Sequence, residues 1–309
     1  MKKKVIFLAG PTAVGKTALS IDLAKQLNTS IISGDSVQVY KYMDIGSAKV
    51  TTEEMDGVRH YLIDEVNPDF EFSVSEFQQR AFKYMNEIWS QGKIPIIAGG
   101  TGLYLNSLLY EMDFNESNAD SKLRDELWKE YEEIGAELLH KKLEALDPAA
   151  ATRIHPNNVK RVIRAIEVNL TQGNMSDFAN DMKKNEEIEP LIFILNRDRE
   201  TLYANINLRV DKMFEAGLLK EVEKLLQMGY NENMISMKAI GYKETVGYLR
   251  GEYSLDRAME IIKQESRRYA KRQLTWFKRY QEAHWVDLDI YDTKKKALDY
   301  MFEIINREF

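Results

Sequence analysis

The chain has 309 residues, of which 44% are hydrophobic and 30% charged, and its formal net charge at pH 7 is −6. These values are typical of a globular protein with one large or two modest domains, and the acidic balance argues against a protein that coats nucleic acid over its whole surface. The sequence has no apolar run of about 18 residues, which excludes a membrane-spanning helix, and no cysteine, which excludes disulfides and thiolate zinc sites. We expect a cytoplasmic monomer without membrane contact.

The segment that says most about chemistry lies near the amino terminus. Residues 5–8 form an apolar run typical of a buried strand, and residues 18–26 have the character of a helix. Between them stands the spacing G-x-x-x-x-G-K-T of a P-loop, whose backbone N–H groups surround a polyphosphate at the start of a helix. The predicted phosphate-binding residues are Gly10, Pro11, Thr12, Ala13, Val14, Gly15, Lys16 and Thr17.

Two side chains of this loop have predicted roles. Lys16 places a positive charge on the terminal phosphate, and the Thr17 hydroxyl reaches a Mg²⁺ ion. The motif predicts a bound polyphosphate, but it does not identify that polyphosphate as ATP. A glycine-rich turn without any ligand is the alternative, and the strand before the loop and the helix after it argue against this.

Two further strands are predicted to end in polar loops. Residues 30–32 lead into the sequence SGDS, residues 94–98 lead into GGTG, and a helix over residues 74–89 lies between them. Strands that alternate with helices indicate a parallel α/β sheet, whose ligands bind at the carboxyl ends of the strands. We therefore expect the P-loop and both polar loops to converge on one crevice.

Each of these two loops carries one candidate functional side chain. Asp35 could bind Mg²⁺ or accept a proton from a nucleophile, whereas the alternative is a turn aspartate that hydrogen-bonds nearby backbone. Thr101 could donate a hydrogen bond to a ligand that the neighbouring glycines allow to come close. The alternative for Thr101 is a tight turn between a strand and a helix.

The chain changes character near residue 115. Helices are predicted over residues 122–133, 136–146 and 159–171. Asp147-Pro148 and His155-Pro156 break them, because the residue before proline avoids the α conformation. This stretch therefore indicates an inserted helical domain.

Beyond the insert the strand pattern returns. An apolar strand is predicted over residues 191–195, helices follow between residues 201 and 281, and residues 284–288 form a last edge strand. The predicted fold class is α/β, a P-loop NTPase-like core with a parallel sheet flanked by helices. The core takes residues 1–114 and 186–309, and the all-helical insertion domain takes residues 115–185.

Two basic segments indicate an anionic partner. One lies in the insert, and the other lies on a predicted helix with aromatic residues interleaved. The basic residues are Arg153, Lys160, Arg161 and Arg164 in the first segment, and Arg267, Arg268, Lys271, Arg272, Lys278 and Arg279 in the second. Either segment alone is typical of a solvated helix face, but together on an acidic chain they favour a surface that binds phosphates and stacks bases.

Other enzyme classes leave weaker signals. The four histidines lack the spacing of a metal site, and no Ser–His–Asp or cysteine nucleophile pattern is present. No apolar strand ends in a second aspartate that would complete a Mg²⁺ site for ATP hydrolysis. This argues against an ATPase or a kinase.

The motifs taken together resemble one family, the tRNA dimethylallyltransferases, also called tRNA isopentenyl-pyrophosphate transferases, in their bacterial form. The resemblance covers nearly the whole chain in the order of that family. Its segments are GPTAVGKT (10–17), GDSVQVYKYMDIGSAK (34–49), GGTGLY (99–104), DPAAATRIHPNNVKRVIRAIEV (147–168), LRVDKMFEAGLLKEV (208–222), AIGYKE (239–244) and RRYAKRQLTWFKRY (267–280). Lys160 and Arg268 stand where glutamine is frequent in the family. Both add positive charge, so the roles of the family's glutamines do not carry over to them in detail.

The resemblance implies an activity. Members of this family transfer a dimethylallyl group from dimethylallyl diphosphate to N6 of the adenosine 3′-adjacent to the anticodon, in tRNAs that read codons beginning with U. It implies that the P-loop holds the diphosphate of the donor with Mg²⁺. It also implies that donor and flipped adenine meet in a channel through the core, and that the helical insert clasps the anticodon stem-loop.

The resemblance also assigns residues. The catalytic ones would be Asp35, which takes the N6 proton, with Thr101 and Lys16, while Arg209 would join the P-loop on the diphosphate and Thr17 would bind the metal. The residues expected to touch tRNA are Asp35, Ser36, Val37, Gln38, Thr101, Arg124, Val159, Lys160, Arg161, Val162, Ile163, Ala239, Ile240, Gly241, Tyr242, Lys243 and Glu244.

Three other functions stay open on the sequence alone. One is an adenylate isopentenyltransferase, which would prenylate a free nucleotide and would have less need of a basic insert. Another is a P-loop small-molecule kinase or ATP-binding switch. The weakest is an RNA-binding module without catalysis, because it leaves the converging strand-end loops unexplained.

Overall fold

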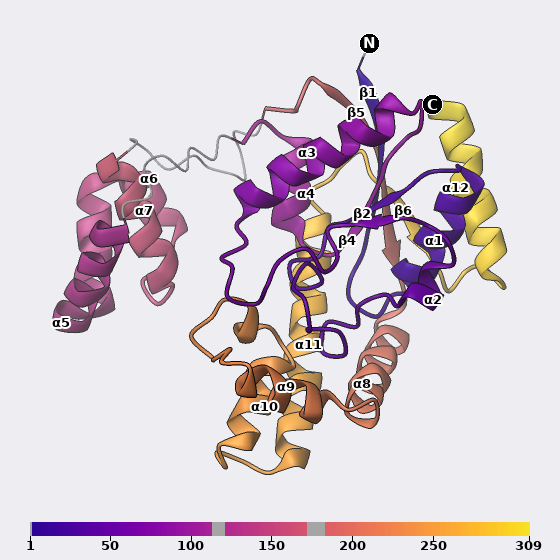
Figure 1. Ribbon diagram of the computed structural model, residues 1–309. Coiled ribbons are helices and arrows are strands. Elements are labelled where there is room, and N and C mark those ends of the chain that lie inside the picture. Colours follow the sequence, from indigo (N-terminus) through magenta and orange to yellow (C-terminus); the bar gives the residue numbers. More distant parts are fainter. Residues whose placement is uncertain (1, 113–120, 172–182) are drawn as a thin grey trace. The chain divides into compact units, whose positions relative to one another are not determined.

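The structure is a computed structural model that describes residues 2–112, 121–171 and 183–309 (Figure 1). It divides into two compact units, one made of Met1–Leu109 and Asn185–Phe309 and the other of Tyr110–Lys184. The first unit is the core and the second is the insert. The sequence-based boundaries after residues 114 and 185 lie slightly further along the chain than these.

The core is built on a parallel sheet with the strand order β3-β2-β4-β1-β5-β6. The strands are β1 (Lys3–Ala9), β2 (Ile31–Ser33), β3 (His60–Tyr61), β4 (Ile96–Gly99), β5 (Ile188–Asn196) and β6 (His284–Asp287). The predicted parallel α/β fold is confirmed. The strands β2, β3 and β4 lie on one side of β1, and β5 and β6 lie on the other, and ligands of such sheets bind where the strand order reverses.

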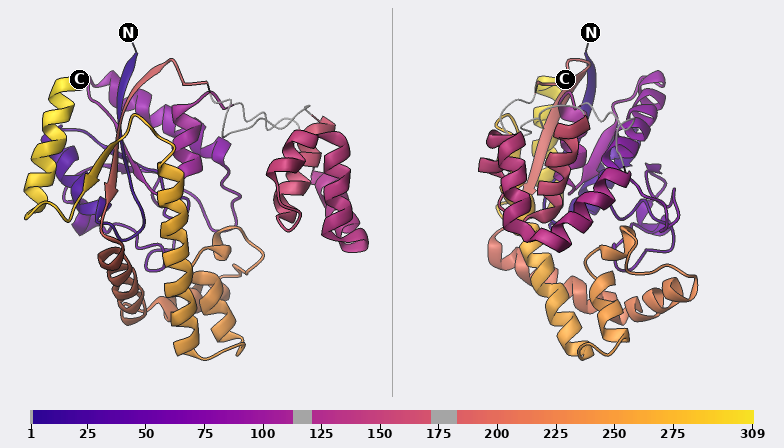
Figure 2. Two further views of the ribbon diagram at one scale, coloured as in Figure 1. Left: turned by 180° about the vertical axis from the view of Figure 1, so that it is seen from behind. Right: turned by 90° about the vertical axis from the view of Figure 1, so that its left-hand side faces the viewer.

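Helices cover both faces of the sheet, α1 and α12 on one face and α3 and α4 on the other, as the views in Figures 1 and 2 show. The helices of the core are α1 (Lys16–Gln26), α2 (Thr52–Met55), α3 (Val74–Ser90), α4 (Gly102–Leu109), α8 (Arg199–Glu215), α9 (Leu218–Gln227), α10 (Tyr242–Leu249), α11 (Leu255–Phe277) and α12 (Lys294–Glu308), with a 3₁₀ helix at Ser236–Lys238.

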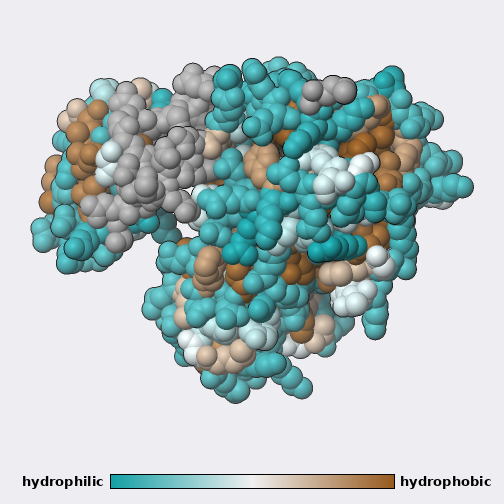
Figure 3. All heavy atoms as spheres, turned by 45° about the horizontal axis from the view of Figure 1, so that its top comes forward, coloured by the Kyte–Doolittle hydropathy of each residue, from teal (hydrophilic) through white to brown (hydrophobic). Residues whose placement is uncertain are grey.

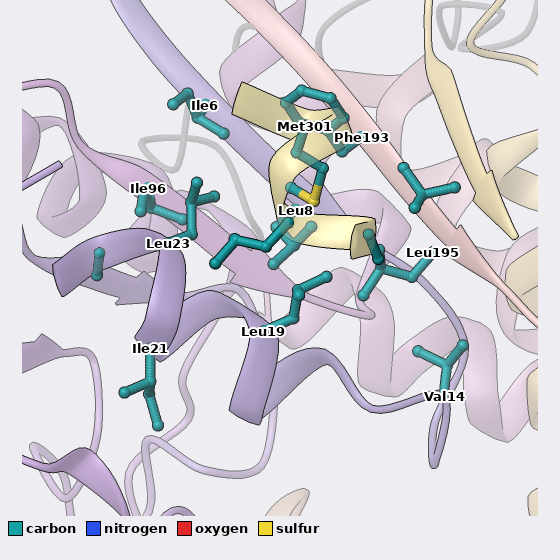
Figure 4. Packing of buried hydrophobic residues seen from close by; sticks show 14 of the residues in the cluster. Ile6, Leu8, Val14, Leu19, Ile21, Leu23, Ile96, Phe193, Leu195 and Met301 are labelled. Atoms are coloured by element: carbon teal, nitrogen blue, oxygen red, sulfur yellow. The ribbon is translucent and has the colours of Figure 1, made fainter. Parts of the chain in front are cut away.

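The packing on the α1 and α12 side involves the apolar part of the first strand, residues 5–9, which is buried throughout. Figure 4 shows Leu8 of β1, Phe193 of β5, Leu19 of α1 and Met301 of α12 gathered in one cluster. Each of these side chains is 0–1% exposed. Burying one such side chain contributes about 1.5–3 kcal/mol, so the strand that carries the P-loop is firmly held.

The insert has an apolar core of its own. It contains α5 (Ser121–Leu146), α6 (Pro148–Arg153) and α7 (Val159–Thr171). Gly135 takes φ 80° and ψ 172° inside α5 and kinks it, which agrees with the two predicted helices that meet there. Leu127, Leu143 and Val162 belong to the buried cluster that joins these helices.

The sequence patterns missed some elements. The strand β3 has two residues, which is too short to show a period, and α2 and α12 were not predicted. Pro190 lies inside β5 rather than before it. It can do so because β5 pairs with β6 only from Phe193 onward, so no partner strand needs an N–H from Pro190 on that side.

Among the described residues no helix combines the length and the apolarity needed to cross a membrane. The face of the molecule drawn in Figure 3 is mostly hydrophilic, with apolar residues in separate smaller areas.

Candidate active site

The P-loop connects β1 to α1 at the carboxyl end of the sheet. Gly10 lies so close to β5 that a Cβ atom there would stand 2.9 Å from the Leu195 carbonyl oxygen. Gly15 has φ 107°, a left-handed conformation that glycine adopts without strain, and α1 begins at the next residue. The loop thus has the conformation and the position, at a helix N-terminus, that bind anions.

Lys16 is the positive centre of this loop. Its Nζ atom donates to the carbonyl oxygens of Gly10 and Pro11, at 2.8 Å each. Burial lowers the pKa of Lys16 to about 7; the Asp35 carboxylate raises it and the Arg209 guanidinium lowers it. Because burial disfavours the charged form of Lys16, an anion bound next to Nζ would stabilise that form more than the carbonyl oxygens do.

The polar loops after β2 and β4 are joined by hydrogen bonds. The Thr101 N–H donates to the Gly34 carbonyl oxygen at 3.2 Å, and the Thr101 hydroxyl accepts from the Ser36 N–H at 3.2 Å. The predicted convergence of these loops is confirmed. Thr101 therefore has a structural role as well as any contact with a ligand.

Asp35 has the hydrogen bonds of a turn aspartate, and its second carboxylate oxygen leaves the functional alternative open. Its Oδ1 atom accepts from the N–H groups of Val37 at 2.8 Å and Gln38 at 3.3 Å, which is the expected turn geometry. Within the described ranges nothing donates to Oδ2. One carboxylate oxygen thus fixes the orientation of the side chain, and the other is available for a proton.

Gly99 sets the spacing between the two loops. A Cβ atom at this residue would lie 2.3 Å from the carbonyl carbon and oxygen of Gly34, directly before Asp35. We expect Gly99→Ala to lower the free energy of unfolding by about 1–3 kcal/mol and to lower activity, because the strand ends must separate. Chemical denaturation measures the first effect.

Gly34→Ala is the matched control for this prediction. The nearest atoms to a Cβ at Gly34 lie at 3.5 Å, an ordinary contact distance. Equal losses of stability in the two variants would show that the close approach at Gly99 has no special cost.

Arg209 of α8 contacts the P-loop although the two are 197 positions apart in the sequence. Its Nη1 atom donates to the Thr12 hydroxyl at 3.2 Å, and its Nη2 atom donates to the Ser47 carbonyl oxygen at 3.1 Å. Burial lowers the pKa of Arg209, and the Asp35 carboxylate opposes that shift. Lys16, Arg209 and Asp35 therefore form one electrostatically coupled cluster.

Gln273 of α11 is a site residue that sequence reasoning missed. Its Oε1 atom accepts from the Thr12 N–H at 2.9 Å, and its Nε2 atom donates to the Gly100 carbonyl oxygen at 2.9 Å. It therefore links the P-loop to the GGTG loop. A signal was present, because Gln273 falls between Ala270 and Phe277 on the buried face of an amphipathic helix, where a polar residue needs a specific partner.

Two cavities meet at Asp35. The smaller has a volume of about 60 Å³ and is lined by Lys16, Thr17, Ser20, Ile31, Ser33, Asp35, Gln38, Val50, His60, Ile63, Ala98 and Gly99. The larger has a volume of about 370 Å³ and is lined by Thr12, Asp35, Ser36, Val37, Gly46, Ser47, Ile206, Arg209, Val210, Met213, Lys238, Ala239, Ile240, Lys243, Ile262, Ser266, Tyr269 and Arg272. Asp35 is common to both linings.

The aromatic residues near Asp35 are kept neutral. The pKa of Tyr269 is raised to about 12, first by burial and then by the Asp35 carboxylate. Burial also raises the pKa of Tyr104, with Tyr40 and Asp35 contributing. The Asp35 carboxylate therefore faces phenol groups that hold their protons over the neutral pH range.

The segment 239–244 is divided between surface and core. Ala239, Ile240 and Lys243 line the larger cavity. Tyr242 and Glu244 are only 0% and 3% exposed, so their side chains support the segment from beneath. Contact between a ligand and this segment can therefore involve its other side chains and its backbone.

The predicted contact residues of the insert are divided in the same way. Val162 and Ile163 are 0% and 1% exposed and belong to the apolar core of the insert, so their side chains are not on the surface of this segment, and contact between the segment and tRNA stays a prediction. Lys160 and Arg161 are exposed and Val159 is half-buried. With 3.6 residues per turn, α7 turns Lys160 and Arg161 to its exposed face and Val162 and Ile163 to its buried face.

Arg124 is held by a buried carboxylate. Its Nη2 and Nε atoms donate to Glu167 at 2.8 and 3.1 Å, Arg164 lies 3.0 Å from the same side chain, and Glu167 is fully buried. We expect Arg124→Ala to destabilise the insert by about 1–3 kcal/mol, because it removes a partner from a buried charge.

Hydrogen–deuterium exchange over residues 121–171 measures this effect. Exchange in α5 and α7 should accelerate in Arg124→Ala and stay unchanged in the control Lys160→Ala, whose side chain is exposed. Equal exchange in both variants would mean that Arg164 alone satisfies Glu167.

The donor set near the P-loop fits Mg²⁺ in one specific way. Thr17, Ser33, Asp35 and Gln38 line the smaller cavity, each has a side-chain oxygen, and hard oxygen donors are the ligands that Mg²⁺ prefers. The described ranges contain no group of three or more His, Cys, Asp or Glu residues that could hold a metal by themselves. A Mg²⁺ ion here would therefore take Thr17 as a protein ligand and depend on phosphate oxygens for the others.

The fold and this site together define a class, the α/β proteins with a P-loop-like core whose ligand binds at the carboxyl ends of the central strands. A family model described as IPP transferase matches residues 38–280. The chain belongs to this family. The resemblance that the ordered motifs indicated is thus confirmed.

Individual relatives agree with this assignment. The chain is 61% identical over 293 residues to a tRNA dimethylallyltransferase of Clostridioides difficile, with 94% of each chain covered. A tRNA delta(2)-isopentenylpyrophosphate transferase structure from Staphylococcus epidermidis is 47% identical, with a TM-score of 0.74 and all of both chains covered. The structure of a eukaryotic dimethylallyltransferase acting on tRNA is 30% identical, with a TM-score of 0.84, and the match covers 100% of this chain and 81% of that one.

Proposed function

We propose that this protein transfers the dimethylallyl group of dimethylallyl diphosphate to N6 of the adenosine 3′-adjacent to the anticodon, in tRNAs that read codons beginning with U. The observation that carries the proposal is the position of Asp35. Its carboxylate lines the cavity next to the P-loop and the larger cavity alike, so it can reach an acceptor that approaches the donor. Membership of the IPP transferase family supports the same reaction.

The proton is handled by Asp35. The exocyclic N6 of adenine is a weak nucleophile, because its lone pair is delocalised into the ring. Oδ2 of Asp35 accepts an N6 proton while N6 forms a bond to C1 of the dimethylallyl group, and Oδ1 stays fixed on the Val37 N–H. General-base catalysis of this kind contributes about 10²–10⁴-fold to the rate.

The leaving group is handled by the P-loop and Arg209. As the bond between C1 and the bridging oxygen breaks, negative charge develops on the diphosphate. Lys16, Arg209 and the loop N–H groups stabilise that charge in a site with little water, where such contacts are strong. A Mg²⁺ ion bound through Thr17 would supply further stabilisation of the same charge.

The larger cavity suits the transferred group and the acceptor. Its volume is about 370 Å³, within the range of small-molecule sites, and Ile206, Val210, Met213 and Ile262 give it an apolar wall. An apolar wall excludes water, which would otherwise intercept the allylic group as it leaves. The polar residues Ser36 and Tyr269 on the same cavity can hydrogen-bond the edge of a base.

The acceptor is expected to be RNA rather than a free nucleotide. Arg272 lies on the larger cavity, Lys271 and Arg268 are exposed on the same helix, and Arg279 is exposed just after the helix ends. The insert adds exposed Lys160, Arg161 and Arg164. These charges suit a phosphate backbone, and an unpaired loop base costs only a few kcal/mol to extrude. That the enzyme acts as a cytoplasmic monomer stays a prediction.

The deciding experiment offers several acceptors to one labelled donor. The protein is mixed with Mg²⁺, radiolabelled dimethylallyl diphosphate and either unmodified tRNA or AMP, ADP and ATP. Label should enter tRNA and leave the free nucleotides unlabelled. Label on free nucleotide alone would identify an adenylate isopentenyltransferase, and ATP turnover without prenyl transfer would identify a kinase or a switch.

A further inference from the structure

A single half-buried side chain holds the loop that lies beside Arg209. Glu221 of α9 accepts three successive backbone N–H groups, those of Asp44 at 3.0 Å, Ile45 at 2.8 Å and Gly46 at 3.1 Å. Its Oε1 atom also accepts from the Tyr242 hydroxyl at 2.8 Å. Neutral side chains rarely satisfy so many donors, whereas a carboxylate with two oxygens can do so.

The same loop is fixed from its other side by Lys49. This lysine is 8% exposed, and its Nζ atom donates to the Tyr40 carbonyl oxygen at 2.7 Å and to the carboxylates of Asp44 and Asp64 at 2.6 Å each. The two charged anchors, Glu221 and Lys49, leave the loop little freedom. Such an arrangement keeps a functional group in one position without induced movement.

The group that this loop positions is the Ser47 carbonyl oxygen. It accepts from Nη2 of Arg209 at 3.1 Å, while Nη1 of the same guanidinium donates to Thr12 of the P-loop. Ser47 is buried, and Gly46 and Ser47 both line the larger cavity. A shift of the loop would therefore turn the guanidinium away from the P-loop.

Tyr242 connects the same anchor to the segment 239–244. A Cβ atom at Gly46 would lie 2.6 Å from the Tyr242 ring, so ring and loop pack closely. Ala239 and Ile240, three and two residues before Tyr242 in the chain, line the cavity in which the acceptor is proposed to bind. One carboxylate thus holds both the loop behind Arg209 and the turn that faces the acceptor.

We propose that Glu221 is a positioning residue. By holding the backbone of residues 44–46, it keeps the Arg209 guanidinium oriented toward the bound diphosphate. Through Tyr242 it also connects this orientation to the segment 239–244, which lines the cavity proposed for the acceptor. This rests on the proposed function, because it gives Arg209 a diphosphate to bind. Glu221 itself touches neither substrate. Its effect on ligand binding must therefore pass through Arg209.

A double-mutant cycle tests that route. The dissociation constant of Mg²⁺-pyrophosphate is measured by calorimetry for the wild type, Glu221→Gln, Arg209→Ala and the double variant. In the wild-type background Glu221→Gln should weaken binding about tenfold, because the amide NH₂ turns a donor toward the loop N–H groups. In the Arg209→Ala background the same change should have an effect smaller than about twofold, since residues that act as one unit are not additive.

The controls separate positioning from general structural damage. Glu223→Gln makes the same charge change at an exposed residue of α9 and should leave binding unchanged. If Glu221→Gln does not fold, the cycle is run with Tyr242→Phe, which removes one of the donors to Glu221 and should weaken binding about twofold to threefold.

Two outcomes overturn the proposal: equal losses on Glu221→Gln in both backgrounds, and no loss in either. Its failure is distinct from a failure of the proposed function. A wild type that binds pyrophosphate but transfers no dimethylallyl group would contradict the enzyme activity alone, and the cycle would still decide the role of Glu221. A wild type that binds no pyrophosphate would contradict both.

Discussion

Asp35→Asn is expected to lower the turnover of dimethylallyl transfer by about 10³-fold, within the range for loss of a general base. Asparagine keeps an oxygen that can accept from the Val37 and Gln38 N–H groups, so the turn after β2 stays intact. It loses the ability to take the N6 proton. Single-turnover measurements with saturating tRNA and donor isolate this chemical step.

The control for this variant is binding in the absence of chemistry. Affinity for tRNA, measured without donor, should change little, because the charges proposed to bind RNA lie on α11 and α7. Asp35→Ala should show the same loss of turnover together with lower stability, since it also removes the turn hydrogen bonds. Near-normal turnover of Asp35→Asn would remove Asp35 from its assigned role.

The parts of the site that follow from local sequence could be predicted. The P-loop needs only an apolar strand, a glycine spacing and a helix start, and all three lie within residues 5–26. Asp35 and Thr101 could be placed beside it, because parallel strands bring their carboxyl ends to one edge of the sheet. Nothing beyond pattern and fold class was needed for these residues.

Other site residues depend on contacts between distant segments. Gln273 bonds to Thr12 across 261 positions of sequence, and Glu221 bonds to Ile45 across 176. In the sequence each is a polar residue on an amphipathic helix, which is typical of solvated surface. Only the packing of α9 and α11 against the loops shows that Gln273 is buried, that Glu221 is half-buried, and that both are hydrogen-bonded to distant backbone.

The contact residues of the insert show a different limit. Arg124 was expected to touch tRNA, and its guanidinium lies on buried Glu167. Val162 and Ile163 were expected to do the same, and both are core residues. The family resemblance consists of continuous stretches of sequence. It therefore includes residues whose side chains form the core of the insert together with residues whose side chains are exposed to a partner. The helical period of α7 distinguishes them.

Lys16 explains why the P-loop should respond to pH. In the ligand-free protein its pKa is about 7, so the side chain is charged below that pH and mostly neutral well above it. The unfolded chain, with an ordinary lysine pKa of 10.5, binds more protons between these values. Stability therefore gains from Lys16 as the pH rises from 7 toward 10.5, and the charged form is disfavoured until an anion binds.

Pyrophosphate binding is expected to take up a proton through Lys16 above pH 7, because the bound anion restores the charged form and raises the pKa. The affinity for pyrophosphate should then fall as the pH rises from about 7.5 to 9, by up to about tenfold per pH unit, relative to a variant without the titrating group. Calorimetry in two buffers of different ionisation enthalpy measures the proton directly.

Lys16→Met, which keeps the length of the side chain but not its charge, should lower turnover by about 10²–10³-fold and abolish the proton uptake assigned to this residue. Lys16→Arg stays charged throughout and should bind without that uptake. The same pH slope in wild type and Lys16→Met would place the titrating group on the ligand and contradict the role of Lys16.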